Sequence, residues 1–256
     1  MKLEDWINRQ LDEVYVSTII IRHQVYKRIN GVPKRQEVYI FLGINLEGHK
    51  KFIDVIVPKE ETTSYWFNII TKFKERGIED FFMVAMVNNQ HLKKAFKMVF
   101  PNVILMPSMC EFYNNSRPYI LQKEHRKLLG QIQKIYVSEN EMEAKKLCKE
   151  LINKYKENKL LLMVINRCIS DIISVIKYSQ EARRITSYTE SFIKLKAKLN
   201  REVNNYKVFE ETIEIKLFFG ELLKKEEEQF KPSKRNWALI INEMDSVITD
   251  KIKEKI

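Results

Sequence analysis

The chain has 256 residues, of which 45% are hydrophobic, enough to bury a core as one domain with an insertion or as two small domains. Its formal charge of +11 favours a polyanionic partner, nucleic acid first, although chains rich in Lys, Ile and Asn are also common in AT-rich genomes. The longest apolar run, residues 160–165, is too short to span a bilayer, and the first residues carry no apolar secretion signal. With three cysteines that lack metal-ligand spacing, these features predict a cytoplasmic protein with reduced thiols and no membrane contact.

The first elements expected are a short helix over residues 3–11 and a strand over residues 14–21. That strand is apolar on both faces, as in the middle of a covered sheet. Gly31, Val32 and Pro33 mark a hairpin into a second strand over residues 38–44, which is nearly continuously apolar and rich in β-branched and aromatic side chains.

A third strand is expected over residues 52–57, after a turn at residues 45–48, and Pro58 ends it because proline has no amide proton for the ladder. Thr62 or Thr63 is a candidate N-cap for the helix that follows, and Gly77 is a candidate C-cap. A central strand over residues 81–87, a helix ending at Pro101 and a strand from Val103 complete an α/β layered domain.

The second half of the chain is predicted to be helical after a loop over residues 107–118. Apolar stripes at helical spacing run through residues 119–178, and a long helix follows with Phe192, Leu195, Leu199 and Val203 inward. Two further helices are expected at about residues 209–229 and 234–253. We therefore predict a sheet core over residues 1–110, a helical insertion over 111–180 and C-terminal helices completing the core over 181–256.

Several motifs, in order along nearly the whole chain, resemble the Mutator-type transposases of bacterial insertion sequences. They are the run Val38-Tyr39-Ile40-Phe41-Leu42-Gly43-Ile44-Asn45-Leu46-Glu47-Gly48, Tyr65-Trp66, residues 74–80, Val99-Phe100-Pro101, and upstream Trp6, Asn8-Arg9 and residues 11–15. Downstream they include Asn115-Ser116, Thr186, Glu190-Ser191 and residues 235–239. The resemblance implies a ribonuclease-H-like mixed sheet with flanking helices, and a DNA transposase activity.

The resemblance also implies a catalytic set of Asp, Asp and Glu, and only the Glu is present. The first Asp position falls on Ile21 and the second on Val87, whereas Glu190 occupies the third. The Cys and His that the family carries after the last strand fall on Ser108 and Glu111. Two divalent metals need several carboxylate oxygens, which Ile and Val do not supply. We therefore expect no metal centre and no cofactor, with Mg²⁺ relevant only if residual activity exists.

Other acids are poorly placed to compensate. Asp80 precedes Val87 by seven residues, roughly 23 Å along a strand at about 3.3 Å per residue, and Asp54 lies inside its own strand. Only Glu111 is a candidate. Ile21 and Val87 are also ordinary strand residues, and Glu190 has an equally simple interpretation as a polar helix residue.

A chain of this charge can still bind the phosphate backbone of DNA, since Lys and Arg neutralise phosphates without recognising the base sequence. The candidate residues are Lys27, Arg28, Lys34, Arg35, Lys93, Lys94, Lys97, Lys123, Arg126, Lys127, Arg183 and Arg184. The alternative is that these side chains are scattered over a solvated surface and bind nothing. The family's helix-turn-helix region lies ahead of the catalytic strand, and only about twenty residues precede that strand here, so we do not expect recognition of specific element ends.

Three functions therefore compete. The first is a transposase-derived, catalytically inactive protein that binds DNA, or that assembles as a homo-oligomer or with a full-length transposase relative. The second is an active transposase that performs metal-dependent strand transfer. The third is a relic of a decayed insertion sequence, against which the intact hydrophobic periodicities argue.

Overall fold

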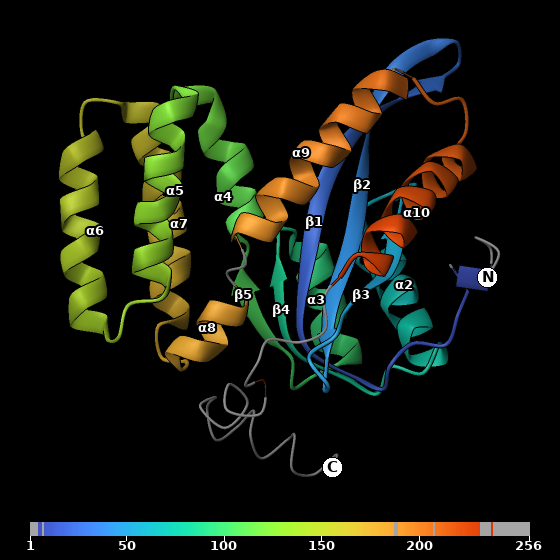
Figure 1. Cartoon of the computed structure of the whole chain (residues 1–256), viewed down its shortest axis with the longest axis horizontal. Helices are drawn as coiled ribbons and strands as arrows, with labels where there is room; N and C mark the ends of the chain where they lie inside the picture. Colours follow the sequence, from blue (N-terminus) through green and yellow to red (C-terminus); the bar gives the residue numbers. More distant parts are fainter. Residues whose placement is uncertain (1–4, 7, 187–188, 207, 231–236, 238–256) are drawn as a thin grey trace. The chain divides into compact units, whose positions relative to one another are not determined.

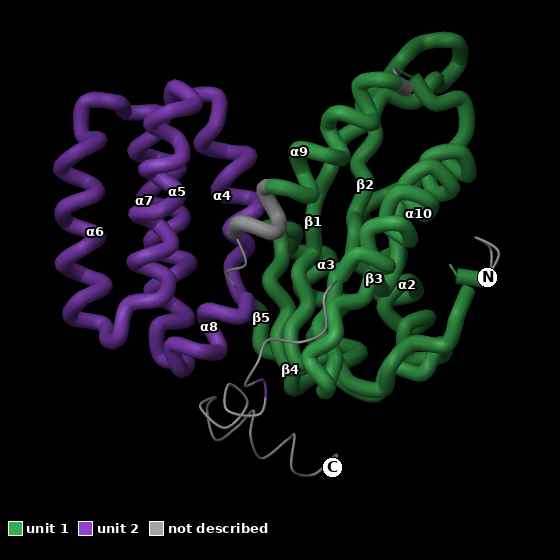
Figure 2. Tube along the Cα trace, viewed as in Figure 1, with its two compact units in different colours: residues 1–105, 191–235 green, residues 106–190, 236–256 purple. Residues whose placement is uncertain are grey.

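The computed structural model describes residues 5–6, 8–186, 189–206, 208–230 and 237, without the side chains of 189–193 and 206. The chain divides into two compact units (Figure 2), each described here by itself. Unit 1 comprises residues 1–105 and 191–235, and unit 2 comprises residues 106–190 and 236–256. The chain thus leaves unit 1, builds unit 2 and returns.

Within the described residues, unit 1 is built on a five-stranded mixed sheet of order β3-β2-β1-β4-β5 (Figure 1). The strands are β1 (Val14–Ile29), β2 (Val32–Asn45), β3 (Lys50–Ile56), β4 (Asp80–Met86) and β5 (Ile104–Pro107). β2 is antiparallel to β1 and β3, whereas β4 runs parallel to β1. The expected strands are confirmed, but β1 is eight residues longer than predicted and β2 begins six residues earlier.

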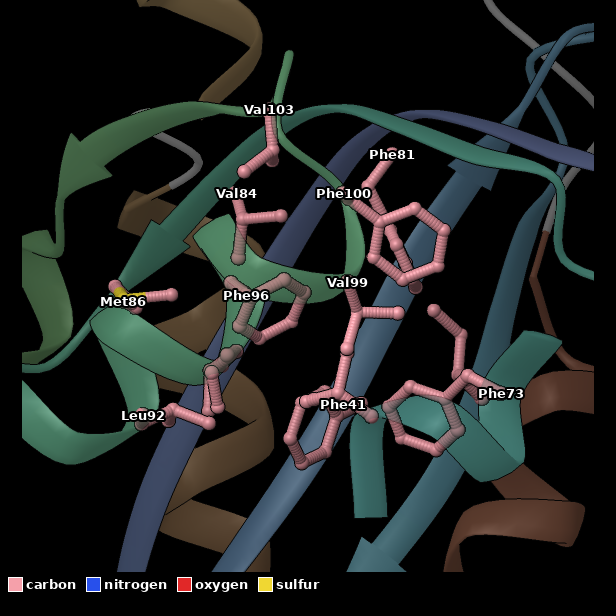
Figure 3. Packing of buried hydrophobic residues seen from close by; sticks show 14 of the residues in the cluster. Phe41, Phe73, Phe81, Val84, Met86, Leu92, Phe96, Val99, Phe100 and Val103 are labelled. Carbon is pink, nitrogen blue, oxygen red and sulfur yellow. The ribbon is translucent and has the colours of Figure 1, made fainter. Parts of the chain in front are cut away.

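Helices α2 (Thr63–Glu75) and α3 (Gln90–Val99) cover one face of this sheet. Thr62 caps α2 by accepting from the Tyr65 amide, and Gly77, with φ at +103°, follows its C-cap, as expected for a residue without Cβ. The ring centroid of Phe41 lies 5.2 Å from that of Phe73 and 6.5 Å from that of Phe96. Figure 3 shows this aromatic cluster between the strands and helices. Burying each such ring contributes about 1.5–3 kcal/mol.

Helices α9 (Thr189–Tyr206) and α10 (Thr212–Glu228) lie on the opposite face. The Phe219 ring of α10 meets His23 of β1 edge-on at 5.6 Å, and Phe230 packs against Phe52 of β3. Leu195 and Leu199, which the sequence assigned to the inward stripe, are buried. The predicted helix over residues 234–253 lies outside the described residues except at Trp237.

Residues from the two ends of the chain hold the edge strand β3. The Arg9 guanidinium donates to the Phe52 carbonyl, while Glu227 of α10 accepts from the Phe52 amide at 3.1 Å and pairs with Arg9 at 3.2 Å. Both backbone groups of Phe52 are thereby satisfied by side chains rather than by another strand. Such a cover protects an edge that would otherwise be open to pairing with another chain.

Unit 2 is helical in the part that the structure describes. It contains α4 (Met109–Ser116), a 3₁₀ turn (Arg117–Tyr119), α5 (Gln122–Tyr136), α6 (Glu141–Tyr155), α7 (Lys159–Val175) and α8 (Gln180–Thr186). The predicted stripe of Leu128, Ile132, Ile135 and Tyr136 is buried, as is Ile165 of α7. Periodicity at helical spacing therefore identified the core of this unit.

Two local predictions were wrong. The loop expected over residues 107–118 contains α4, which begins after the N-cap Ser108, because Ser108 accepts a hydrogen bond from the Cys110 amide at 3.2 Å. The helix expected over residues 3–11 does not extend through Arg9–Leu11, which are irregular. Arg9 there donates to the carbonyls of Trp6 and Phe52, and these tertiary contacts replace a helical ladder.

Candidate functional site

Ile21 lies in β1, and Val87 follows β4, which pairs in parallel with β1. The β1–β4 ladder ends at the pair of Ile19 with Ala85, so both positions lie two residues beyond its end. Val87 follows directly after the last residue of β4. The two positions that the resemblance assigns to the catalytic Asp pair thus lie just beyond the paired part of two neighbouring strands, and Val87 packs in the core cluster that contains Trp66 and Leu92.

Neither position offers a ligand atom. Ile21 is 1% exposed and Val87 is fully buried, so water is excluded from both side chains. Ile21 stands opposite Ile40 of β2, on the sheet face that carries α9 and α10. No group of three or more His, Cys, Asp or Glu that could hold a metal ion occurs among the described residues. The residues present at this level therefore do not fit a two-metal centre.

The remaining residues of the implied catalytic set are dispersed. Glu190 lies in the first turn of α9 and closes the 106–190 segment of unit 2, but its side chain is outside the described part. Ser108 caps α4, and Glu111 lies in the first turn of that helix, where a carboxylate complements the helix dipole. Both residues therefore have a local helical role.

Asp54, considered as a compensating acid, is bound to a cation. Its carboxylate accepts from Arg76 Nη1 at 2.6 Å, and the same guanidinium donates to the carbonyls of Arg9 and Ile53. Burial raises the pKa of Asp54, while Arg76 opposes the increase. Asp80 begins β4, so strand geometry keeps it away from Val87 at the other end.

Glu61 is a carboxylate near the strand ends that sequence reasoning missed. It accepts from the Tyr39 hydroxyl at 2.9 Å and from Asn89 Nδ2 at 2.6 Å, joining β2, the segment before α2 and the segment before α3. Asn89 also caps α3 by accepting from the Leu92 amide. Burial raises the pKa of Tyr39 and keeps its hydroxyl protonated as a donor. In the sequence, the position of Asn89 between a strand and a helix could have indicated this site. No sequence feature indicated Glu61.

The β1–β2 hairpin extends past its neighbours as a two-stranded arm, residues 23–38. β3 pairs with β2 only as far as Tyr39, and β4 pairs with β1 only as far as Ile19. At about 3.3 Å per residue, the eight residues from His23 to Asn30 span roughly 26 Å. Asn30 and Gly31, both with positive φ, form the two-residue turn at its tip.

Four of the predicted DNA-binding residues lie in this arm, at Lys27, Arg28, Lys34 and Arg35. Lys27 stands directly across from Lys34, and its ammonium donates to the Thr212 hydroxyl at 2.8 Å. Arg28 pairs with Glu210 at 3.0 Å. Lys34 and Arg35 are exposed and belong to none of the salt bridges found among the described residues. The arm therefore presents cations to solvent.

The other predicted cations are distributed over both units. On α3, Lys93 donates to Asn88 and Lys97 donates to the Val103 carbonyl, whereas Lys94 is exposed. On α5, Lys123 and Arg126 are exposed and Lys127 pairs with Glu124 at 2.9 Å. Arg184 is half exposed and pairs with Glu181.

Arg183 is a correction to the predicted DNA-binding set, because its side chain is buried at 1% exposure. Its guanidinium donates to the backbone carbonyls of Tyr136, Ser138 and Tyr178 at 2.5, 2.7 and 3.0 Å. A guanidinium engaged in this way joins α8 to the end of α5 and does not reach a phosphate in solvent.

Across the described residues, no helix is both long enough and apolar enough to cross a membrane. The cysteines at 110, 148 and 168 are free thiols, and burial raises the pKa of the Cys168 thiol. A thiol kept protonated is a poor nucleophile and metal ligand.

The chain is similar to known proteins over most of its length. The model of the family described as "Transposase, Mutator family" matches residues 1–233. A probable transposase for an insertion sequence element of Corynebacterium diphtheriae is 21% identical over 205 residues, covering 78% of this chain and 59% of the relative.

Two further relatives match a shorter part of the chain. The transposase for insertion sequence element ISRM5 of Rhizobium meliloti (strain 1021) is 24% identical over 143 residues, which is 56% of this chain and 36% of that protein. The transposase for insertion sequence element IS1201 of Lactobacillus helveticus is 22% identical over 149 residues, 56% of this chain and 38% of that protein. The chain thus spans between about one third and three fifths of the length of these relatives.

Proposed function

Because the chain belongs to the Mutator family of transposases, whose model matches residues 1–233, we propose that it is a transposase-derived DNA-binding protein that does not cut DNA. The observation that carries this proposal is that Ile21 and Val87, the two positions where the resemblance requires metal-binding carboxylates, carry buried apolar side chains. Phosphoryl transfer through two metals requires oxygen ligands that this pair lacks. The proposed location of this protein is the cytoplasm.

The proposed fold is ribonuclease-H-like. It is supported by the three-strand antiparallel meander β1–β3, by β4 parallel to β1, and by helices on both sheet faces. In that fold the acids come from the central strand, the next parallel strand and a late helix. Ile21, Val87 and Glu190 lie on β1, directly after β4 and on α9, in agreement with this assignment.

The proposed DNA contact is made through phosphates. Its support is the net charge of +11 together with the exposed cations Lys34, Arg35, Lys94, Lys123 and Arg126. Each phosphate that is neutralised releases a counterion, so the affinity falls steeply as salt concentration rises. Binding of this kind requires no divalent metal.

One experiment separates this proposal from an active transposase. Fluorescence anisotropy of a labelled duplex is measured across a salt series with and without Mg²⁺, and nicking of supercoiled plasmid is followed with Mg²⁺ or Mn²⁺. We expect salt-sensitive binding that ignores Mg²⁺, and no nicking. Metal-dependent nicking that disappears in Glu190→Ala would identify an active enzyme, and absence of binding at low salt would favour a relic.

A second candidate function is assembly with another copy or with a longer transposase. The exposed apolar side chains of Leu160 and Met163, in the first turn of α7, favour it, since exposed apolar side chains that lie together mark contact surfaces. Sedimentation of the wild type and of Leu160→Gln/Met163→Gln tests this role. A concentration-dependent dimer that the double variant lacks would support it, and a monomer in both would exclude self-assembly.

A further inference from the structure

The β1–β2 arm differs from the other basic segments in its shape. It extends beyond the part of the sheet that pairs with β3 and β4, and the ten residues around its tip, 26–35, contain four cations and no carboxylate. Across the ladder, Lys27 faces Lys34. Like charges directly opposite one another destabilise a hairpin, so this rung has a cost in the free protein that an anion between the strands would remove.

The tip of the arm is apolar as well as basic. Ile29 and Val32 form the last cross-strand pair before the turn, and they are 36% and 55% exposed. Tyr26, three rungs further back and therefore on the other face, is 47% exposed. The exposed side chains of Ile29 and Val32 contribute nothing to the core of unit 1, and cations flank them on both strands.

The β1 strand of the arm is held close to its tip by the segment before α10. Phe209 accepts from the Arg28 amide and donates to the Tyr26 carbonyl at 2.8 and 2.9 Å, so residues next to α10 add a short third pairing to β1. Lys27 and Arg28 are bound by Thr212 and Glu210 from the same segment. An arm supported in this way presents its tip in a fixed direction relative to unit 1, with little conformational freedom to lose on binding.

We propose that this arm lies in the major groove of duplex DNA, with Ile29 and Val32 toward the base edges and the exposed cations Lys34 and Arg35 toward the flanking phosphates. The major groove is about 12 Å wide and accepts a two-stranded ribbon, whereas the minor groove is about half as wide. Apolar side chains contact thymine methyl groups there. This inference rests on the proposed DNA binding and adds the groove and the element that enters it.

The test compares two variants that each remove two positive charges. Lys34→Gln/Arg35→Gln neutralises the exposed side of the arm, and Lys146→Gln/Lys149→Gln neutralises two exposed lysines on α6. With a 30-base-pair duplex, the arm variant is expected to reduce the magnitude of the slope of log affinity against log salt by about 2, since each lost phosphate contact removes roughly 0.9. The α6 variant is expected to have the same slope as the wild type. Circular dichroism melting of both variants controls for folding.

Methylation by dimethyl sulfate then identifies the groove. Wild-type protein is expected to protect guanine N7, in the major groove, and Ile29→Ser/Val32→Ser to lose that protection while keeping most of its affinity. Binding by wild type without N7 protection, or with equal slopes in both charge variants, overturns the arm assignment and leaves the proposed DNA binding intact. Failure of wild type to bind any duplex at low salt overturns the proposed function itself.

Discussion

Arg76 Nη1 lies 2.6 Å from the Asp54 carboxylate, and this ion pair joins the residue that ends α2 to the edge strand β3. Both side chains are 17% exposed. We expect Arg76→Ala to lower the free energy of unfolding by about 3 kcal/mol, because it leaves a largely buried carboxylate without its partner.

The double variant Arg76→Ala/Asp54→Ala removes both charges and is the control for this pair. It is expected to be more stable than Arg76→Ala alone in urea unfolding at neutral pH, since no unpaired charge remains. Additive losses from the two single substitutions would show that the pair is not coupled.

Ile21→Asp and Val87→Asp, alone and together, test the adjacency of these positions. Each is expected to destabilise the chain by about 3 kcal/mol or more, since a carboxylate is placed where the native side chain is at most 1% exposed. Adding Mn²⁺ should raise the melting temperature of the double Asp variant, because a metal bound only to the folded state stabilises it. The matched Ile21→Asn/Val87→Asn variant should not respond. Equal responses of both variants to Mn²⁺ would exclude a shared site.

His23 predicts a pH dependence of stability. Burial, together with the nearby Lys196 ammonium, lowers its pKa to about 4. The unfolded chain therefore binds the proton first as pH falls. The contribution of His23 is fully present above about pH 6.5 and is lost progressively down to about pH 4, for a total of about 3 kcal/mol.

The variant His23→Leu removes this term, so its stability between pH 7 and pH 4 should fall less steeply than that of wild type. Chemical unfolding at half-unit pH intervals measures both curves. Parallel curves across this range would show that His23 does not titrate as its burial implies.

Arg183 and Arg184 are neighbours with opposite environments. Arg183→Ala is expected to cost about 3 kcal/mol or more, because three backbone carbonyls lose a charged donor. Arg184→Ala should cost less than about 1 kcal/mol, since its pair with Glu181 is exposed. Hydrogen exchange at residues 136–138 should accelerate only in the Arg183 variant; similar exchange in both would contradict the assignment.

Local signals in the sequence predicted much of the fold. Thr62, Gly77 and the apolar run at residues 38–44 specify their own caps and strand, since these depend on neighbours in sequence. Helix α4 was missed although Ser108 and Glu111 have the spacing of a capping box, because the polar residues 114–116 favoured a loop. The arm was underestimated because residues 32–37 are mostly polar, and cross-strand pairing rather than propensity maintains them.

The candidate site was less accessible to sequence reasoning. The assignment of Ile21 and Val87 to the two Asp positions follows from the ordered motifs, but the parallel pairing of β1 with β4 appears only in the structure. The burial of Arg183 runs against the usual exposure of charged side chains, and no spacing distinguishes it from Arg184. Glu61 meets Tyr39 and Asn89 only through tertiary packing.

The contact between Phe52 and Glu227 joins residues 175 positions apart. On a ribosome, β3 is therefore made long before the helix that satisfies its edge. At roughly 5–20 residues per second, that interval lasts on the order of 10 to 35 s. Throughout it, the nascent sheet carries an open strand edge, which is a template for pairing with another chain until α10 has been made.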